Sequence, residues 1–260
     1  MKLSLIIPAY NEEQRLRPAL AEYLGFFLPR YVNEIEFLIV VNGSTDHTEQ
    51  VARDIANDDP RIRVIVEPKR VGKGGAVRLG FEAARGDLIG FVDADGSTPP
   101  AAFQDLVDKI GDAGAIIASR WHRDSKITPQ PLSRRIASRL FNWWVRLLFH
   151  LPITDTQCGA KVFTAPAVRA ALPHLGTTQW AFDVDLLFQL RRAGYQIKEI
   201  ATVWHDKAGS RLHVMTASLE MFAALIRLRL LYSPFKWVVP LVNRTIGRFM
   251  PWDERRGRKL

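Results

Sequence analysis

The stretch LIGFVDADG at residues 88–96 is an apolar run that ends in two carboxylates. A run of this length and composition is typical of a strand covered on both faces of a sheet. Ending a buried strand with Asp93 and Asp95 is costly unless a positive group lies beside them. Hard oxygen ligands suit Mg²⁺ or Mn²⁺, so the pair indicates a divalent cation that binds a diphosphate. The alternative is two acids in a solvated turn before Thr98.

Similar short apolar runs lie on both sides of this stretch and alternate with helical patterns. The pattern predicts strands at 2–8, 35–41, 62–66, 87–92 and 115–118, and helices at 12–27, 45–57, 74–84 and 101–111. Strands that alternate with helices of 10–15 residues favour an α/β fold with a mostly parallel central sheet flanked by helices. Further along, the sequence predicts helices at 132–149, 182–193 and 214–231 and strands at 159–164 and 195–201. Ligands of such sheets bind beyond the carboxyl ends of the strands.

Three other strand ends carry unusual residues: PAYNE at 8–12, NGSTD at 42–46 and RVGKGGA at 70–76. Asn11 is expected to cap the helix that follows, with Glu12 in its first turn. The glycine-rich segment lets backbone N–H groups approach a phosphate while Lys73 adds a cation, although a simple turn is the alternative. It matches neither a Walker A sequence nor the dinucleotide fingerprint, which argues against an oxidoreductase of the Rossmann type.

The chain has 260 residues, of which 47% are hydrophobic, so it is long and apolar enough for a sizeable core. Its one cysteine, Cys158, excludes a disulfide framework and a zinc site with several thiolates. The apolar start is too short for a secretory signal, and no uncharged apolar stretch approaches the roughly 18–20 residues of a spanning helix. We therefore expect a cytoplasmic protein.

The net charge of +9 is concentrated at the C-terminus, where nine Lys or Arg face only Asp253 and Glu254 from residue 226 onward. Basic residues there alternate with aromatic and aliphatic ones around Phe235 and Trp237, which suits a segment lying on anionic lipid. The helix at 132–149 adds basic residues and tryptophans to such a face: Arg135, Arg139, Trp143 and Trp144. The alternatives are a helix packed on the body or an oligomer contact. A nucleic-acid-binding module is a poorer fit because no recognition motif is present.

Taken together, the motifs resemble family 2 glycosyltransferases with the GT-A fold. The resemblance extends over ASR at 118–120, DTQCG at 155–159 and GSRL at 209–212, and looks like the dolichyl-phosphate glucosyltransferase branch of the polyprenyl-phosphate sugar synthases. It implies an inverting, metal-dependent transfer of a hexose, expected to be glucose from UDP-glucose, to dolichyl or polyprenyl phosphate. Its motifs lie within residues 3–212, so we expect a catalytic domain at 1–212. The basic and aromatic residues of the tail predict an amphipathic helical attachment at 213–260, on the inner face of the membrane.

The resemblance assigns roles to individual residues. The nucleotide sugar is expected to lie against Pro8, Ala9, Tyr10, Glu12, Asn42, Lys73, Asp93 and Ala94. The metal, Mg²⁺ or Mn²⁺, is expected on Asp95, with His205 as a further ligand unless that histidine is structural. The acceptor phosphate or donor diphosphate is expected to be bound by Arg120, Arg134 and Arg211. Asp155 is expected near the transfer centre, with a structural acid in a turn as the alternative.

Two departures from the family pattern affect the substrates. Relatives usually carry two aspartates where this chain has Val41 and Asn42, which puts recognition of the base in question, although an amide still donates and accepts hydrogen bonds. The mannosyl branch often has glutamine where this chain has Ser97, which favours the glucosyl type. Transfer from GDP-mannose, and transfer to a soluble or protein acceptor, remain open alternatives.

Overall fold

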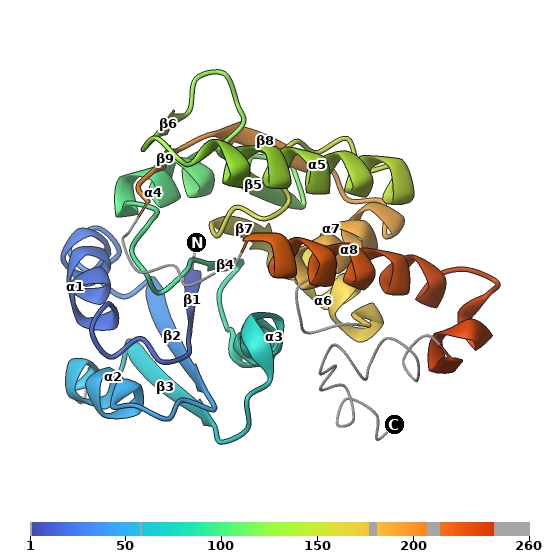
Figure 1. The fold of residues 1–260 in the computed structure, drawn as a ribbon. Helices are drawn as coiled ribbons and strands as arrows, with labels where there is room; N and C mark the ends of the chain where they lie inside the picture. The colour runs from blue at the N-terminus through green and yellow to red at the C-terminus, as the bar shows by residue number, and fades with distance from the viewer. Residues whose placement is uncertain (1, 58, 177–180, 207–213, 242–260) are drawn as a thin grey trace.

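A seven-stranded sheet forms the centre of the protein in the computed structural model, which describes all residues except 1, 58, 177–180, 207–213 and 242–260 (Figure 1). The strands run in the order β3-β2-β1-β4-β7-β5-β8. Their bounds are β1 Leu3–Ala9, β2 Ile35–Asn42, β3 Ile62–Glu67, β4 Leu88–Phe91, β5 Ala115–Ser119, β7 Lys161–Thr164 and β8 Ile197–Ala201. Only β7 runs antiparallel to its neighbours β4 and β5 among the described pairings. The expected mostly parallel sheet is confirmed.

Helices cover both faces of this sheet, as the continuous apolar strands require. On one face α1 (Leu16–Phe27), α2 (Thr48–Ala56) and α4 (Pro100–Lys109) pack on a core that includes Leu5 and Phe37. On the other face α3 (Gly72–Ala83), α6 (Ala165–Ala171) and α7 (Phe182–Arg192) pack on Ile6 and Phe91. The alternation of Leu5 and Ile6 between the two cores follows from the two-residue period of a strand.

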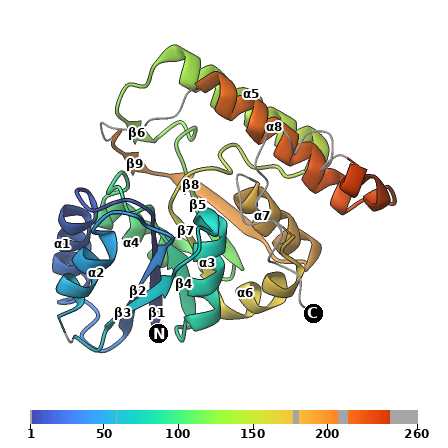
Figure 2. The ribbon, with the colours of Figure 1, turned by 60° about the horizontal axis from the view of Figure 1, so that its bottom comes forward.

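Two long helices lie against one another beyond the sheet. Figures 1 and 2 show α5 (Leu132–Phe149) and α8 (Val214–Leu231) side by side. The rings of Trp144 on α5 and Phe222 on α8 meet at 5.0 Å. A small parallel sheet of β6 (Lys126–Ile127) and β9 (Val203–Trp204) joins the start of α5 to the end of β8. The short 3₁₀ turns are η1 (Leu172–His174) and η2 (Lys236–Val238).

The expected elements are present, with some differences. The helix predicted at 12–27 begins only at Leu16, and Asn11 adopts a left-handed conformation with φ 52°, so the expected cap at Asn11 is wrong. Instead the Asn11 carboxamide accepts a 2.9 Å hydrogen bond from the backbone N–H of Thr45, which ties two site loops together. Helix α6 was not expected because its seven residues are too few for a periodic pattern. The reversed direction of β7 also has no local signal.

Across the described ranges, no helix has both the length and the hydropathy that a bilayer-spanning segment requires.

Candidate functional site

The site is built at one edge of the sheet, where several strands end. Parallel β1, β2 and β4 end there with Ala9, Asn42 and Phe91. β7 is antiparallel and starts at this edge, with Lys161 paired to Phe91. The loop 155–160 before β7 therefore lies beyond the end of β4, beside Asp93. The ends of β5 and β8 pair Ser119 with Ala201 at the same edge.

Lys73 and Asp93 form the ion pair at the centre of this edge. Lys73 lies in the first turn of α3, and its Nζ is 2.6 Å from Asp93 Oδ1. Burial raises the pKa of Asp93, but the charges of Lys73, Lys161 and Arg120 outweigh it and hold that pKa below its usual value. Both side chains are about one third exposed, so the pair remains within reach of a ligand.

Arg120 and Asp155 form a second ion pair, which joins the end of β5 to the loop before β7. The guanidinium donates to both carboxylate oxygens, at 2.8 and 2.9 Å, and the Arg120 backbone N–H adds a third bond of 2.9 Å. Burial alone would raise the pKa of Asp155, but Arg120 and Lys161 lower it below the usual range. This bidentate geometry fixes the Arg120 side chain, and its charge lies 5.6 Å over the ring of Trp204.

A third pair, Lys161 and Asp183, lies behind the first two and was missed in the sequence. Lys161 Nζ is completely buried and donates to Asp183 Oδ1 and to the carbonyl of Cys158, both at 2.6 Å. The second bond ties the loop 155–160 to the first residue of β7. A signal for this pair was present in the sequence, since Lys161 is a lone lysine inside the apolar strand predicted at 159–164. A lysine buried in such a strand requires an acidic partner.

Asp95 and His205, the two expected metal ligands, come from segments that touch. Ser97 donates its backbone N–H to Asp95 Oδ1 at 2.9 Å and accepts a 2.8 Å bond from the backbone N–H of His205. The His205 side chain is exposed. The described residues include no group of three or more His, Cys, Asp or Glu side chains that would hold a metal. Within the part of the chain that the structure describes, Asp95 and His205 are thus the candidate protein ligands here.

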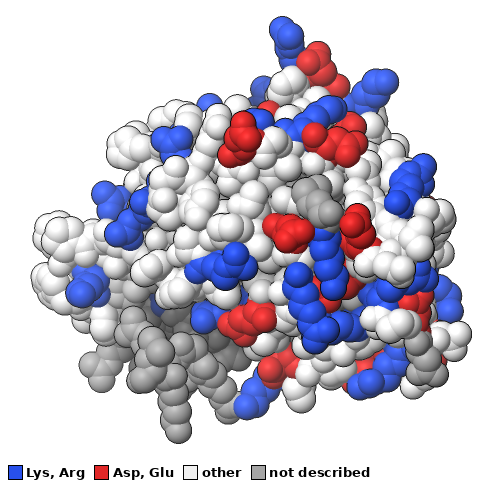
Figure 3. Space-filling view, turned by 180° about the vertical axis from the view of Figure 1, so that it is seen from behind, with Lys and Arg blue, Asp and Glu red and all other residues white. Residues whose placement is uncertain are grey.

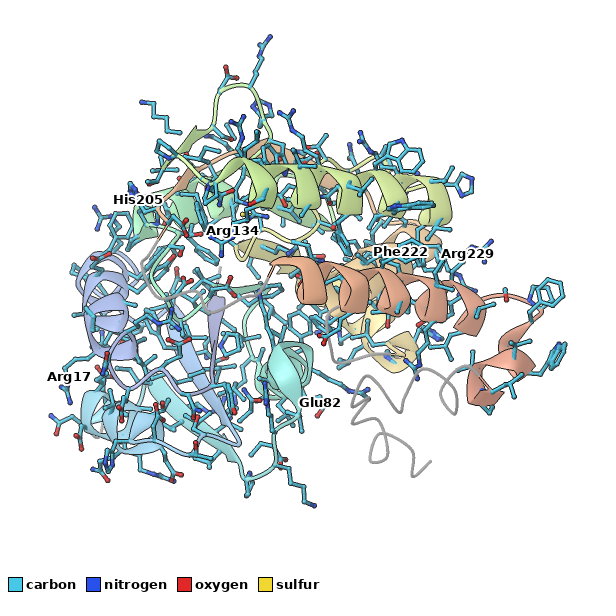
Figure 4. All side chains as sticks on the ribbon, viewed as in Figure 1. Arg17, Glu82, Arg134, His205, Phe222 and Arg229 are labelled. Carbon is cyan, nitrogen blue, oxygen red and sulfur yellow. The ribbon has the colours of Figure 1, made fainter. Side chains whose placement is uncertain are left out.

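Arg134, at the start of α5, lies at the same end of the molecule as His205 (Figure 4). Its Nη1 is 3.0 and 3.1 Å from the two carboxylate oxygens of Asp206. The structure thus brings Arg134 to the chain segment that follows His205. The third expected arginine, Arg211, falls outside the described residues.

The expected base-binding residues lie at the ends of β1 and β2. Asn42 is buried and donates from Nδ2 to the carbonyl of Ala9 at 3.1 Å. Its Oδ1 is buried without a hydrogen-bond partner among the described residues. The guanidinium of Arg70 stacks over the Tyr10 ring at 4.4 Å. Pro8 lies in β1, next to its last residue, Ala9. Ala94 is buried and lies in the sequence between Asp93 and Asp95.

Glu12 lies close to both acids at the end of β4. Burial raises its pKa and the charges of Asp95 and Asp93 add to that rise, while Arg15 opposes it through bonds of 2.6 and 2.7 Å. A hollow of about 180 Å³ lined by Arg15, Asp95 and Gly96 opens next to this group. Several acids of this edge are thus paired with a cation: Glu12, Asp93, Asp155, Asp206 and, behind them, Asp183. Asp95 and Asp46 differ, because the described residues give them bonds from backbone N–H groups.

Comparison with known proteins identifies the family. The sequence profile of "Glycosyl transferase family 2" matches residues 4–169. The chain belongs to this glycosyltransferase family. Dolichyl-phosphate beta-glucosyltransferase of Drosophila melanogaster is 34% identical over 260 residues, a match that covers 94% of this chain and 79% of the relative. The enzyme of the same name from Saccharomyces cerevisiae is 32% identical and the match covers 88% and 75%.

A longer relative shares the same region. Glycosyltransferase AglD of Haloferax volcanii is 31% identical over 232 residues, which are 87% of this chain but only 37% of AglD. This glycosyltransferase chain thus spans little more than a third of that relative.

Solved structures confirm the GT-A fold. Glucosyl-3-phosphoglycerate synthase from Mycobacterium tuberculosis, in complex with Mn²⁺ and UDP-glucose, aligns with a TM-score of 0.65 at 19% identity, covering 88% of this chain and 78% of that one. S. aureus TarS in complex with UDP-GlcNAc aligns with a TM-score of 0.58 at 17% identity, covering 95% and 73%. At these identities the likeness concerns the fold.

Proposed function

We propose that this glycosyltransferase moves glucose from UDP-glucose to dolichyl phosphate or another polyprenyl phosphate, with inversion at the anomeric carbon. The single observation that carries the proposal is the pairing of acids with cations at the sheet edge. An acceptor alcohol needs a general base, whereas a phosphate monoester is already ionised near neutral pH. A site in which Glu12, Asp93 and Asp155 are each paired with Lys or Arg suits the second kind of acceptor. The names of the curated relatives agree with it.

The acceptor phosphate would bind between Arg120 and Arg134, with Arg211 as a third cation. The ion pair with Asp155 holds the Arg120 guanidinium in one orientation, and the ion pair with Asp206 holds that of Arg134. A bidentate guanidinium is the donor that matches a phosphate group best. Positioned there, a phosphate oxygen attacks C1 of glucose while the bond from C1 to the UDP oxygen breaks, and its electron pair leaves with the diphosphate. Attack from the opposite face converts an α-linked donor into a β-linked product.

The donor would lie along the ends of β1, β2 and β4. The unpartnered Asn42 Oδ1 is a buried acceptor, and uracil offers it an N3–H donor. The aromatic face of Tyr10 and the guanidinium of Arg70 above it would bound the nucleoside. Asn42 would thus take the place of the aspartate that relatives carry. Lys73 would lie beside the diphosphate.

Mg²⁺ or Mn²⁺ fits the donor set only if the nucleotide supplies further oxygens. Asp95 offers a carboxylate whose described hydrogen bond uses one oxygen, and His205 offers an exposed imidazole on the adjoining segment. Both are ordinary ligands of these metals. When bound, the cation would neutralise negative charge on the leaving diphosphate. A site with two protein ligands would bind metal weakly until UDP-glucose or UDP is present.

Residues 1–212 would carry both substrates, and the chain from 213 onward would help to hold the enzyme at the cytoplasmic surface of the membrane.

A transfer assay tests the function. The enzyme is supplied with short-chain dolichyl phosphate, Mn²⁺ or Mg²⁺, and labelled UDP-glucose or GDP-mannose in parallel. The expected result is label in lipid from UDP-glucose alone. Label from GDP-mannose alone would establish the mannosyl alternative. Binding of UDP without label in any lipid phosphate would overturn the acceptor and favour a soluble or protein acceptor.

A further inference from the structure

Helix α5 exposes a row of large apolar side chains along its whole length. The row consists of five side chains that are 48–68% exposed: Leu132, Ile136, Leu140, Trp143 and Leu147. Their spacing of three or four residues places them on one side of the helix. Scattered single apolar residues are ordinary on a protein surface, but a continuous row along 18 residues of helix is not.

The helix that carries this row is firmly held. Its opposite side buries Phe141, Val145 and Phe149 in the core, and α8 packs along its flank through Trp144. The exposed row is therefore not a core face left open by a loose helix. It is a fixed apolar strip on the surface of the enzyme.

The charges that α5 itself carries are all positive. Arg135, Arg139 and Arg146 are exposed on α5, and the helix contains no Asp or Glu. Figure 3, which shows the molecule from behind, has Lys and Arg side chains scattered among uncharged residues at its left side. An apolar strip flanked by cations is complementary to the headgroups and acyl boundary of an anionic bilayer.

Aromatic residues continue the exposed apolar surface at the far end of α8. Phe235 and Trp237 lie in and just before η2 and are 59% and 71% exposed. Aromatic side chains of this kind favour the interface between water and lipid. They follow directly on the helix that packs beside α5.

We propose that the exposed face of α5, Leu132 to Leu147, is the surface by which this enzyme docks on an anionic membrane. The inference rests on the proposed function for the identity of the acceptor. Arg134 lies in the first turn of the same helix, so docking by this face places the site's end of α5 at the bilayer, where a polyprenyl phosphate presents its headgroup. The lipid tail then stays in the membrane while its phosphate reaches Arg134.

The test compares two variants of the full chain by co-sedimentation with vesicles of phosphatidylcholine containing phosphatidylserine. Leu140→Glu combined with Leu147→Glu places one charge in the middle of the strip and one at its end, and glutamate keeps the helix because it is a good helix former. Val32→Glu is the matched control, since Val32 is apolar and 64% exposed but lies between α1 and β2. The wild type and the control are expected to bind, and the double variant to bind at least tenfold more weakly.

Activity separates this inference from the function on which it rests. With a water-soluble short-chain acceptor phosphate, the double variant is expected to match the wild type, while transfer to long-chain acceptor in vesicles falls at least tenfold. Equal vesicle binding by the double variant and the wild type would overturn the docking face. A wild-type dimer that the double variant converts to monomer, without vesicle binding by either, would overturn it in favour of a second copy. Vesicle binding without transfer to any lipid phosphate would leave the docking face in place and overturn the acceptor.

Discussion

Gly159 lies so close to Asp93 that a Cβ at this position would overlap the carboxylate oxygen Oδ2. The contact joins the loop before β7 to the end of β4, the two segments that the reversed strand brings together. The carboxylate of Asp93 thus lies between Gly159 on one side and Lys73 on the other. The absence of a side chain at Gly159 is thus part of the geometry of the donor site.

Gly159→Ala is expected to displace Asp93 and lower kcat/KM for the nucleotide sugar by about 100-fold, the scale of a displacement of about 1 Å in an active site. Gly25→Ala is the control, because nothing lies within 4 Å of a Cβ there and the position is inside α1. The control is expected to retain activity and to gain a few tenths to about 1 kcal/mol in the free energy of unfolding. Full activity of Gly159→Ala would contradict a role for the close approach of Gly159 to Asp93 in positioning that carboxylate.

Arg120→Ala is expected to lower the free energy of unfolding by about 3 kcal/mol or more, because it leaves the fully buried Asp155 carboxylate without its counter-charge. Chemical denaturation measures the change. Arg123→Ala, at an arginine that is 89% exposed, provides the comparison and is expected to change stability by less than about 0.5 kcal/mol. A similar small effect for both variants would show that the buried pair does not stabilise the fold.

Acidification is expected to destabilise the protein below about pH 4, the ordinary range of an aspartate. The pKa of Asp155 is lowered in the folded state, so the unfolded chain takes up the proton first and stability falls as the pH drops toward the folded value. Thermal melting between pH 5 and pH 3 measures this. Asp155→Asn is expected to melt lower at pH 7 and to show a smaller decrease over that interval. If the melting temperature of the variant fell as steeply with pH as that of the wild type, Asp155 would be excluded as a source of the acid sensitivity.

Asp95→Asn is expected to reduce transfer by at least about 100-fold while thermal stability stays near that of the wild type, because the amide oxygen still accepts from Ser97 and only the charge is lost. Titration calorimetry is expected to show Mn²⁺ binding that is tight only with UDP present, and weakened by Asp95→Asn and by His205→Ala. Equal Mn²⁺ affinity with and without UDP would contradict a site that shares its ligands with the nucleotide.

Cys158 is expected to react slowly with thiol reagents in the folded protein. The side chain is 1% exposed, and burial, together with the charge of Asp155, raises the pKa of the thiol to about 11. Only the thiolate is reactive, so the rate in denaturant should exceed the native rate by at least tenfold. Since the chain has one cysteine, the native rate reports opening of the loop 155–160. Rapid native labelling would show that this loop is not closed.

The elements of the fold follow from local patterns in the sequence. The apolar runs that form β1, β2 and β4, and the periodicity that forms α5 and α8, are properties of neighbouring residues. The direction of β7 depends on which strands it joins, far away in the chain, and no local pattern carries that information. The late start of α1 has a similar cause, because the Asn11 side chain bonds Thr45 instead of its own helix.

The sequence predicted which residues belong to the site but not which of them bond to one another. The motifs placed Asp93, Lys73, Arg120 and Asp155 among the functional residues, and the fold brings them to one edge of the sheet. The bonds among them, and the buried pair of Lys161 and Asp183 behind them, depend on side-chain geometry. The roles assigned to these residues, and the domain boundary after residue 212, stay predictions.

The position of β7 also bears on how the chain is made. β4 pairs with β1 on one side, but its other side pairs with β7, so that edge stays open until residue 164 has been synthesised. At about 5–20 residues per second, the ribosome needs roughly 4–15 s to pass from one strand to the other. During this interval an apolar strand edge beside the future nucleotide site has no partner of its own. β4 therefore presents an unpaired strand edge during synthesis, well before the catalytic residues have met.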